Sequence, residues 1–258
     1  MNKTLDNIQS NTLFVGRNLV YLPTCHSTNT YAAQITADNK VFEGTVVLTD
    51  CQTAGRGQRG NGWEAEPYQN ITLSVVFYPH FLKAHQQFDL NIAMAWGIYL
   101  FFSQHLPPER LKIKWSNDIF FEDRKICGML IENTLKAEQI EKSIVGTGIN
   151  VNQTQFFYPK ATSIQMITKQ AYDLKVLIGQ LCDCIEQSYL LLQQGKIDQL
   201  RTNYLEKLYR MGEKSFFVAT ENEHYFEGVI TGITQEGKLA IETNGRIETF
   251  SFKTIRFL

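Results

Sequence analysis

The stretch from Asp50 to Trp63 constrains the fold more than any other part of the chain. It holds four glycines and two arginines, and it follows a short apolar run at 45–48. Glycine lets the backbone bend sharply and expose N–H groups. Such groups beside arginine side chains suit a phosphate or a carboxylate. Taken alone, the same residues are equally compatible with a flexible surface loop or with an RGG-like RNA-binding segment.

The flanking residues place this stretch between two predicted strands, 41–49 and 70–78. A connection of about twenty residues inside a compact domain is typically functional or mobile. We therefore expect the loop to belong to a binding site.

Composition excludes several classes of protein. The 258 residues carry a net charge of −1, so the broad basic field expected of a nucleic-acid-binding protein is missing. The five cysteines show no CxxC pair, which argues against zinc and favours reduced thiols in the cytoplasm. Residues 1–11 are polar, unlike a signal peptide, and the longest apolar run, 92–102, is too short to span a bilayer.

The remaining pattern predicts an α+β fold with a mixed sheet flanked by helices. Predicted helices cover 88–105, 173–193 and 197–209, and a shorter one starts at Ser27 or Thr28. Further predicted strands cover 112–121, 125–132 and 140–145, and residues 146–152 read as a glycine-containing turn. After Gly212 come five short strands, at 215–219, 225–233, 238–243, 246–250 and around 255.

Two turn signals, Glu236-Gly237 and Asn244-Gly245, indicate tight hairpins in this last part. Such a meander predicts a small SH3-like β-barrel. The chain is therefore expected to divide into a large domain, 1–211, and a small one, 212–258.

Four motifs, taken in order, resemble the biotin protein ligase family. They are Ser27-Thr28-Asn29; Gly55 to Gly60 closing at Trp63; Lys114-Trp115-Ser116-Asn117-Asp118 with Arg124-Lys125 and Gly128; and Gly146-Thr147-Gly148-Ile149-Asn150. Each motif is weak alone, but the ordered set is specific, and the resemblance covers the chain from about residue 20 onward. It implies a catalytic domain related to class II aminoacyl-tRNA synthetases, followed by the small barrel.

The resemblance also implies a reaction in two steps. Biotin and ATP, with Mg²⁺ carried by the ATP, would give biotinyl-5′-AMP, and the biotinyl group would then pass to a lysine of a biotin carboxyl carrier protein or domain. The early position of Ser27 is similar to the monofunctional type without a DNA-binding domain, so we expect neither DNA nor a membrane as a partner. Monomer and homodimer are both compatible with the sequence.

The resemblance also implies which residues of this chain would bind biotin and which would bind ATP. Biotin would be bound by Ser27, Thr28, Asn29, Gln52, Gly55, Arg56, Gly57, Gln58, Trp63, Lys125, Gly128 and Gly148, with Ile149 as a further apolar wall. ATP would be bound by Arg56, Arg59, Trp63, Asn117, Lys125 and Asn150, and no protein residue is assigned to the metal.

Catalysis would fall to Lys125, Arg56, Arg59 and Asp118. The cations offset the repulsion between a carboxylate and an α-phosphate. Asp118 would orient the carrier amine and accept its proton only in part. It would not act as a strong base, because a carboxylate is a much weaker base than an amine. Gln58 stands where many relatives have arginine, which predicts weaker retention of biotinyl-AMP, and Ser116 stands where many have proline.

Two other functions remain open. A lipoate or octanoate ligase would share the catalytic fold but would need a longer, more apolar acyl slot. A non-catalytic sensor of biotin or nucleotide would be expected to lack Arg56, Asn117 or Lys125, and all three are present.

Overall fold

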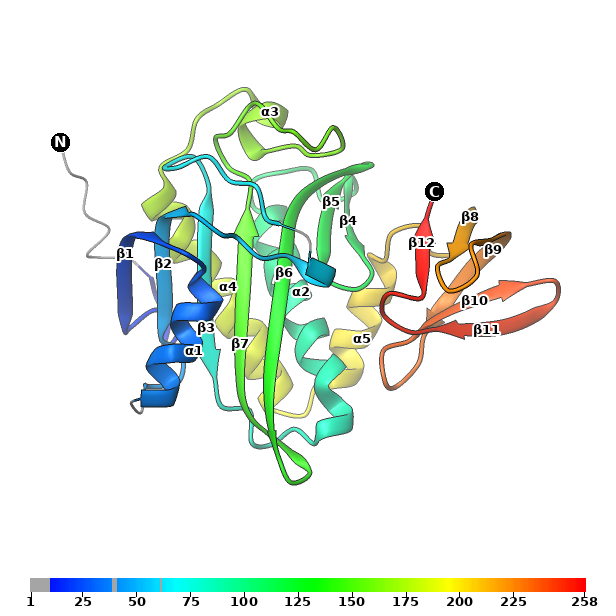
Figure 1. Cartoon of the computed structure of the whole chain (residues 1–258), viewed down its shortest axis with the longest axis horizontal. Helices are drawn as coiled ribbons and strands as arrows, with labels where there is room; N and C mark the ends of the chain where they lie inside the picture. The colour runs from blue at the N-terminus through cyan, green and yellow to red at the C-terminus, as the bar shows by residue number, and fades with distance from the viewer. Residues whose placement is uncertain (1–9, 39–40, 61) are drawn as a thin grey trace.

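A seven-stranded mixed sheet forms the centre of the molecule in the computed structural model, which describes residues 10–38, 41–60 and 62–258. Its spatial order is β1 (Leu19–Cys25), β2 (Val46–Gln52), β3 (Ile71–Phe77), β7 (Gln139–Ile149), β6 (Arg124–Lys136), β5 (Asp118–Phe121) and β4 (Leu111–Lys114) (Figure 1). Strands β1 and β2 are parallel, and every other neighbouring pair is antiparallel. The predicted mixed sheet is thus confirmed.

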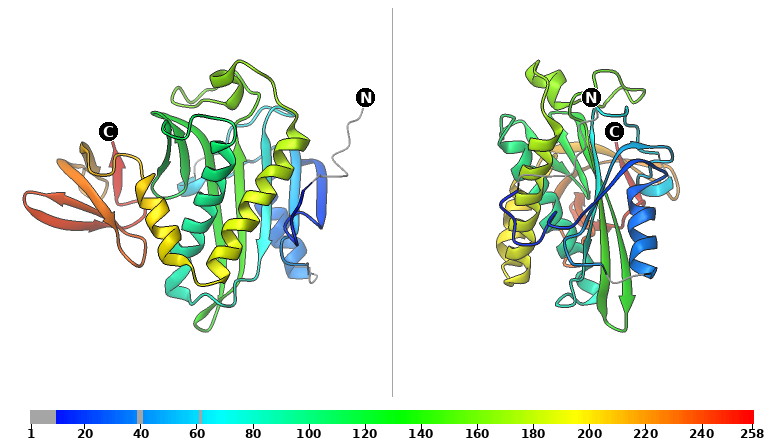
Figure 2. Two further views of the ribbon diagram at one scale, coloured as in Figure 1. Left: turned by 180° about the vertical axis from the view of Figure 1, so that it is seen from behind. Right: turned by 90° about the vertical axis from the view of Figure 1, so that its left-hand side faces the viewer.

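Helices cover both faces of this sheet. One face carries α2 (Gln87–Ser103), α4 (Leu174–Gln193) and α5 (Ile197–Glu206), whereas α1 (Thr28–Asp38) lies on the other face, as the edge-on view in Figure 2 shows. A short α3 (Ile164–Thr168) lies beyond one end of the sheet. Every residue of β3 is buried because both of its faces are covered, which explains why five of its seven residues are apolar.

The predicted helices agree closely with the observed ones. Asp173, the predicted first residue of a helix, is the N-cap of α4 and accepts a 2.9 Å hydrogen bond from the backbone N–H of Lys175. Helix α2 is apolar on nearly all sides because the sheet lies beneath it and helices α4 and α5 pack against it on the same face (Figure 2). None of the helices in the described part of the chain is long and apolar enough to cross a bilayer.

A second sheet of five antiparallel strands follows. Its order is β11 (Arg246–Phe250), β10 (Leu239–Thr243), β9 (His224–Ile233), β8 (Lys214–Ala219) and β12 (Ile255–Phe257). The predicted Asn244-Gly245 turn joins β10 to β11, and both residues have positive φ angles, 50° and 72°, as a tight hairpin requires. The five predicted strands are confirmed as a sheet.

The two sheets share one apolar core, and the turn at Gly237 is one of the places where they contact each other. Phe217, Ile230 and Leu239 belong to the same buried cluster as the residues of the large sheet. The indole N–H of Trp115 donates to the carbonyl oxygen of Gly237 at 2.9 Å. Gly237 itself lies against Phe88 so closely that an added Cβ would be 2.1 Å from the ring.

The segment 146–150 corrects one expectation from the sequence. It is not a turn, because β7 continues through it to Ile149, with Gly146 opposite Leu130 and Gly148 opposite Gly128. These glycines serve a different purpose from chain reversal. A Cβ at Gly146 would lie 2.2 Å from Asn29 Oδ1, so the bare backbone makes room for a neighbouring side chain.

The predicted strand 112–121 is also corrected. It is divided into β4 and β5 by a turn at 115–117, so that the two halves pair with each other. This turn brings Asn117 and Asp118 to the edge of a cavity.

Candidate active site

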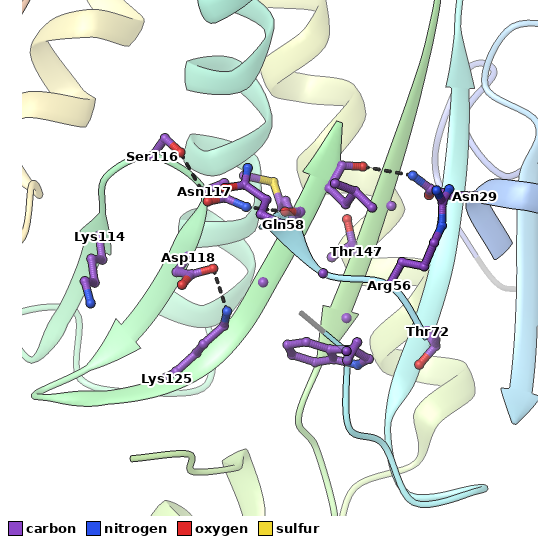
Figure 3. Close-up of a pocket in the computed structure, with 18 of the residues that line it drawn as sticks. Asn29, Arg56, Gln58, Thr72, Lys114, Ser116, Asn117, Asp118, Lys125 and Thr147 are labelled. Carbon is purple, nitrogen blue, oxygen red and sulfur yellow. Dashed lines mark hydrogen bonds and ion pairs between the residues drawn. The ribbon is translucent and has the colours of Figure 1, made fainter. Parts of the chain in front are cut away.

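A cavity of about 390 Å³ opens beside the large sheet, and its lining includes Ser27, Thr28 and Asn29 at the start of α1. Its walls come from the start of α1, the end of β2, the loop after β2, the first half of β6, the end of β7 and the β4–β5 turn (Figure 3). Arg256 of β12 and Phe252 in the connection between β11 and β12 complete the lining. Thus motifs that are far apart in the sequence meet at one place.

One end of the cavity is polar and uncharged. Ser27, Thr28 and Asn29 are nearly buried, and all three line the cavity. The backbone N–H of Thr28 has no partner within helix α1, because it lies in the first turn, and it donates instead to Gln52 Oε1 at 2.8 Å. The Thr28 hydroxyl donates to the same oxygen at 3.2 Å. Ser27 takes the N-cap position, since its carbonyl oxygen accepts from the N–H of Tyr31 at 3.0 Å.

Ser74, on β3, leaves this polar end short of hydrogen-bond donors. Its hydroxyl lies 2.8 Å from Thr28 Oγ1 and 2.6 Å from Asn29 Oδ1. A hydroxyl has one proton, so it can satisfy only one of these two acceptors at a time. Thr28 has already given its own proton to Gln52. Among the described residues no further donor reaches either oxygen, so the site is complementary to a ligand that brings an N–H or O–H group.

Trp63 forms an apolar wall over bare backbone. A Cβ at Gly148 would lie 2.2 Å from Trp63 Cε2, and one at Gly128 would lie 3.1 Å from Trp63 Cζ3. The indole therefore lies directly against β6 and β7. Its Nε1 and the Oγ1 of Thr147 are buried and have no hydrogen-bond partner in the described part of the chain.

The other end of the cavity is charged. Lys125 Nζ is 2.8 Å from Asp118 Oδ1, an ion pair whose members are about three-quarters buried, and it also lies 5.6 Å from the centre of the Trp63 ring. Asn117 donates its amide N–H to the carbonyl oxygen of Met129, which fixes the turn beside β6.

Lys114 adds a second cation at this end. Its Nζ lies 4.7 Å from the centre of the Phe120 ring and 5.0 Å from that of Phe257. Burial lowers the pKa of Lys114, opposed by the nearby carboxylate of Asp118 and reinforced by neighbouring cations. Asp118 is the one carboxylate among the described residues that line the cavity. A single carboxylate paired with lysine is a poor Mg²⁺ site, so Mg²⁺ would arrive with a phosphate ligand.

The glycine loop closes one side of the cavity. Residues 56 and 62 form an isolated β-bridge, and the Trp63 N–H donates to the Gly55 carbonyl oxygen at 2.9 Å. Arg56, Gly57 and Gln58 line the cavity, and Arg56 Nη2 is 2.8 Å from Glu132 Oε2. The Arg59 side chain lies outside the described part of the structure.

The structure therefore gathers most of the residues predicted for the site: Ser27, Thr28, Asn29, Gln52, Arg56, Gly57, Gln58, Trp63, Asn117, Asp118, Lys125, Gly128 and Gly148 all line one cavity. Gly55 lies just behind Trp63, where a Cβ would be 2.6 Å from the Trp63 carbonyl oxygen.

Two predicted residues lie elsewhere. Ile149 is part of the apolar core and does not line the cavity. Asn150 is buried and donates to the carbonyl oxygen of Thr162 at 3.0 Å, so it fixes the segment before α3. Its Oδ1 has no partner in the described residues, and its assignment to ATP stays a prediction.

Sequence reasoning gave no site role to several lining or supporting residues: Ser74, Glu132 and Arg256, and also Lys114 and Thr147, which stand within the quoted motifs. Ser74 and Thr72 are polar residues in a mostly apolar strand, and this was a usable signal. Nothing local marks Glu132 or Arg256, because their importance depends on distant parts of the chain.

A cavity with a donor-poor polar end, an indole wall and a cationic end defines a protein that binds a small molecule carrying both donor groups and negative charge. Comparison with known proteins narrows this class. The model of the Biotin/lipoate A/B protein ligase family matches residues 21–150, about half of the chain. The chain therefore belongs to the Biotin/lipoate A/B protein ligase family.

Individual relatives are similar over most of their length. The Bifunctional ligase/repressor BirA of Bacillus subtilis is 29% identical over 242 residues, which cover 91% of this chain and 72% of the relative. The Biotin--[acetyl-CoA-carboxylase] ligase of Mycobacterium tuberculosis is 26% identical, covering 85% of this chain and 81% of the relative.

Solved structures show the same fold. The structure of biotin protein ligase from Aquifex aeolicus in complex with biotin and ATP superposes with a TM-score of 0.75 at 24% identity, and the match covers 94% of this chain and 99% of that one.

Proposed function

We propose that this protein is an ATP-dependent biotin protein ligase. In the first step the biotin carboxylate attacks the α-phosphate of ATP, pyrophosphate leaves, and biotinyl-5′-AMP forms. In the second step a lysine amine of a biotin carboxyl carrier protein or domain attacks the acyl carbon. AMP leaves, the amine loses its proton, and an amide bond joins biotin to the carrier.

The observation that carries this proposal is the shortage of donors at the polar end of the cavity. The Ser74 proton is shared between Thr28 Oγ1 and Asn29 Oδ1, so one acceptor needs a donor from the ligand. The ureido ring of biotin has two N–H donors. The dithiolane of lipoate and the chain of octanoate have no such donor, so neither would add a hydrogen bond to Thr28 Oγ1 or Asn29 Oδ1. The site therefore favours biotin.

The cationic end suits the first step. A carboxylate and an α-phosphate repel each other, and cations placed beside both lower this cost. Lys125 is a compact point charge within the cavity, and Arg56 can bind phosphate oxygens through two nitrogens. Trp63, over the bare backbone at Gly148, would pack against the apolar part of biotin. Mg²⁺ would enter with ATP as part of the substrate.

Asp118 suits the second step. It lies at the cavity edge on the β4–β5 turn, where an incoming amine can reach it. Because it is paired with Lys125 at 2.8 Å, we assign it the orientation of the carrier amine, with partial acceptance of the proton.

The proposal extends to the organisation of the chain. We assign residues 1–211 to a catalytic domain related to class II aminoacyl-tRNA synthetases and residues 212–258 to an SH3-like barrel. The start of the second sheet at Lys214 supports this boundary. We further propose that the reaction takes place in the cytoplasm.

Biotin-dependent exchange of labelled pyrophosphate into ATP tests the first step, with lipoate and octanoate as matched alternatives. We expect exchange with biotin and at least about a hundredfold less with the other two, in line with losing a hydrogen bond to a buried polar group. Exchange driven equally well by lipoate would replace this function with that of a lipoate ligase. Tight binding of biotin without any exchange would identify a sensor.

A further inference from the structure

Glu132 connects the glycine loop to the polar end of the cavity without lining the cavity itself. On β6, its Oε2 lies 2.8 Å from Arg56 Nη2 of the glycine loop and 2.7 Å from Asn29 Nδ2 at the polar end. Asn29 Oδ1 in turn faces the Ser74 hydroxyl at 2.6 Å. One carboxylate oxygen thus accepts from a loop arginine and from a residue that the proposed ligand ring would contact.

The side-chain amide of Asn29 links Ser74 to Glu132 through hydrogen bonds on its two sides. It is almost fully buried, and its Nδ2 donates both to Glu132 and to the Leu130 carbonyl oxygen at 3.1 Å. A ligand N–H that donates to Asn29 Oδ1 would polarise the amide and strengthen the bond from its Nδ2 to Glu132. The Glu132 carboxylate would then hold Arg56 more firmly.

The side chain of Arg56 is held in place by few contacts. Its side chain is about half exposed and stands on a loop of four glycines, so the unbound side chain has many conformations. Only Nη2 contacts Glu132, which leaves the other donors of the guanidinium group for an anion. An arginine that is already ordered loses less entropy when a phosphate binds, and binding is tighter for that reason.

We propose that Glu132 is a positioning residue that couples binding of the biotin ring at Asn29 to binding of the ATP phosphates at Arg56. This inference rests on the proposed function. It assigns a role to a residue outside the family motifs, and it predicts that each ligand raises the affinity for the other by the same factor, as linkage requires.

Titration calorimetry on the full chain measures this coupling. The probes are biotin and the non-hydrolysable α,β-methylene analogue of ATP, each alone and each with the other at saturation. In the parent protein we expect about tenfold tighter binding of either ligand in the presence of the other, within the usual range of such couplings. Glu132→Met, of similar length but without a carboxylate, should reduce the factor to about twofold or less while each ligand alone still binds within about threefold.

Two further variants of the same residue keep the test decisive. Glu132→Gln retains an amide oxygen that can accept from both partners, so it should restore part of the coupling. Glu132→Asp is one methylene shorter and cannot reach both Arg56 and Asn29, so it should lose the coupling. This variant takes the place of Glu132→Met if the methionine protein fails to fold.

Glu141→Met is the matched control. Glu141 lies on β7 of the same hairpin, has an exposed fraction of 41% against 40% for Glu132, and pairs with Lys136 at 3.3 Å away from the cavity. It should keep the parent coupling. Absence of coupling in the parent, or full coupling in Glu132→Met, would overturn the inference. Failure of the parent to bind biotin at all would instead reject the proposed function, and the inference with it.

Discussion

Replacing Gly148 with alanine tests the packing of Trp63 on the floor of the cavity. The added Cβ would lie 2.2 Å from Cε2 and 2.5 Å from Cζ2 of the indole. Ordinary carbon contacts are about 3.5–4.0 Å, so the ring must withdraw by more than 1 Å, roughly. A misplacement of this size can cost about a hundredfold in rate, which corresponds to about 2.7 kcal/mol.

Stability should change much less than activity in this variant. Trp63 stands on a loop and can move away without displacing β7, so the overpacking cost should be near the low end of about 1–3 kcal/mol. Removing a strand glycine returns roughly 0.5–1 kcal/mol of backbone entropy. We therefore expect a nearly unchanged free energy of unfolding, measured by urea denaturation, together with about a hundredfold lower kcat/KM in pyrophosphate exchange.

Two neighbouring glycines supply a graded comparison. A Cβ at Gly128 would lie 3.0 Å from Lys125 Nζ, which requires only small shifts, and one at Gly62 would lie 3.8 Å from its nearest neighbour, an ordinary contact. The loss of exchange should follow the order Gly148→Ala, then Gly128→Ala, then Gly62→Ala. A Gly148→Ala protein within threefold of the parent would refute this account of the cavity wall.

Four further outcomes are expected. Lys125→Ala should lower adenylate formation by several orders of magnitude, and exchange within tenfold of the parent would remove Lys125 from the reaction centre. Asp118→Asn should slow transfer from preformed biotinyl-AMP to the carrier more than it slows exchange; equal losses in the two assays would contradict its role. Arg201→Met should cost about 3–5 kcal/mol in urea denaturation, because it leaves Asp89, paired with Arg201 at 2.6 Å and almost fully buried, without a partner; a cost below 1 kcal/mol would show that the pair is dispensable. Gln58→Arg should slow the release of labelled biotinyl-AMP in rapid filtration, because a guanidinium binds phosphate more tightly than an amide, and an unchanged release rate would argue against a retaining function of the loop.

The long elements were predictable because their signals are local. The Asp173 cap and the helical spacing after it are contained in one short segment, and so is the Asn244-Gly245 turn. Residues 146–150 misled the same reasoning, since glycine usually marks a turn. Here the glycines admit Asn29 and Trp63, which come from more than eighty residues earlier in the chain, and no local pattern reveals such a contact.

The candidate site was predictable where the motifs themselves supply the side chains. Lys125 and Asp118 belong to the same sequence motif, and in the structure they form an ion pair. Ser74 and Glu132 were not recognised, because each acts through a residue of another element and gains its meaning from burial and distance. The chemistry of single residues can be read from the chain, but the hydrogen-bond connections between them require the fold.

The turn at Gly237, where the second sheet contacts Phe88 and Trp115, also limits how such a chain can change over evolutionary time. Gly237 is fixed twice, by a φ of 85° and by the Phe88 ring that fills the space of its missing side chain. Its carbonyl oxygen accepts a hydrogen bond from Trp115, which itself lines the cavity. A larger residue at 237 requires a smaller one at 88 and a shifted partner at 115. We therefore expect these three positions, distant in sequence, to be substituted together, and we expect change in the small sheet to be restrained by the cavity that it helps to close.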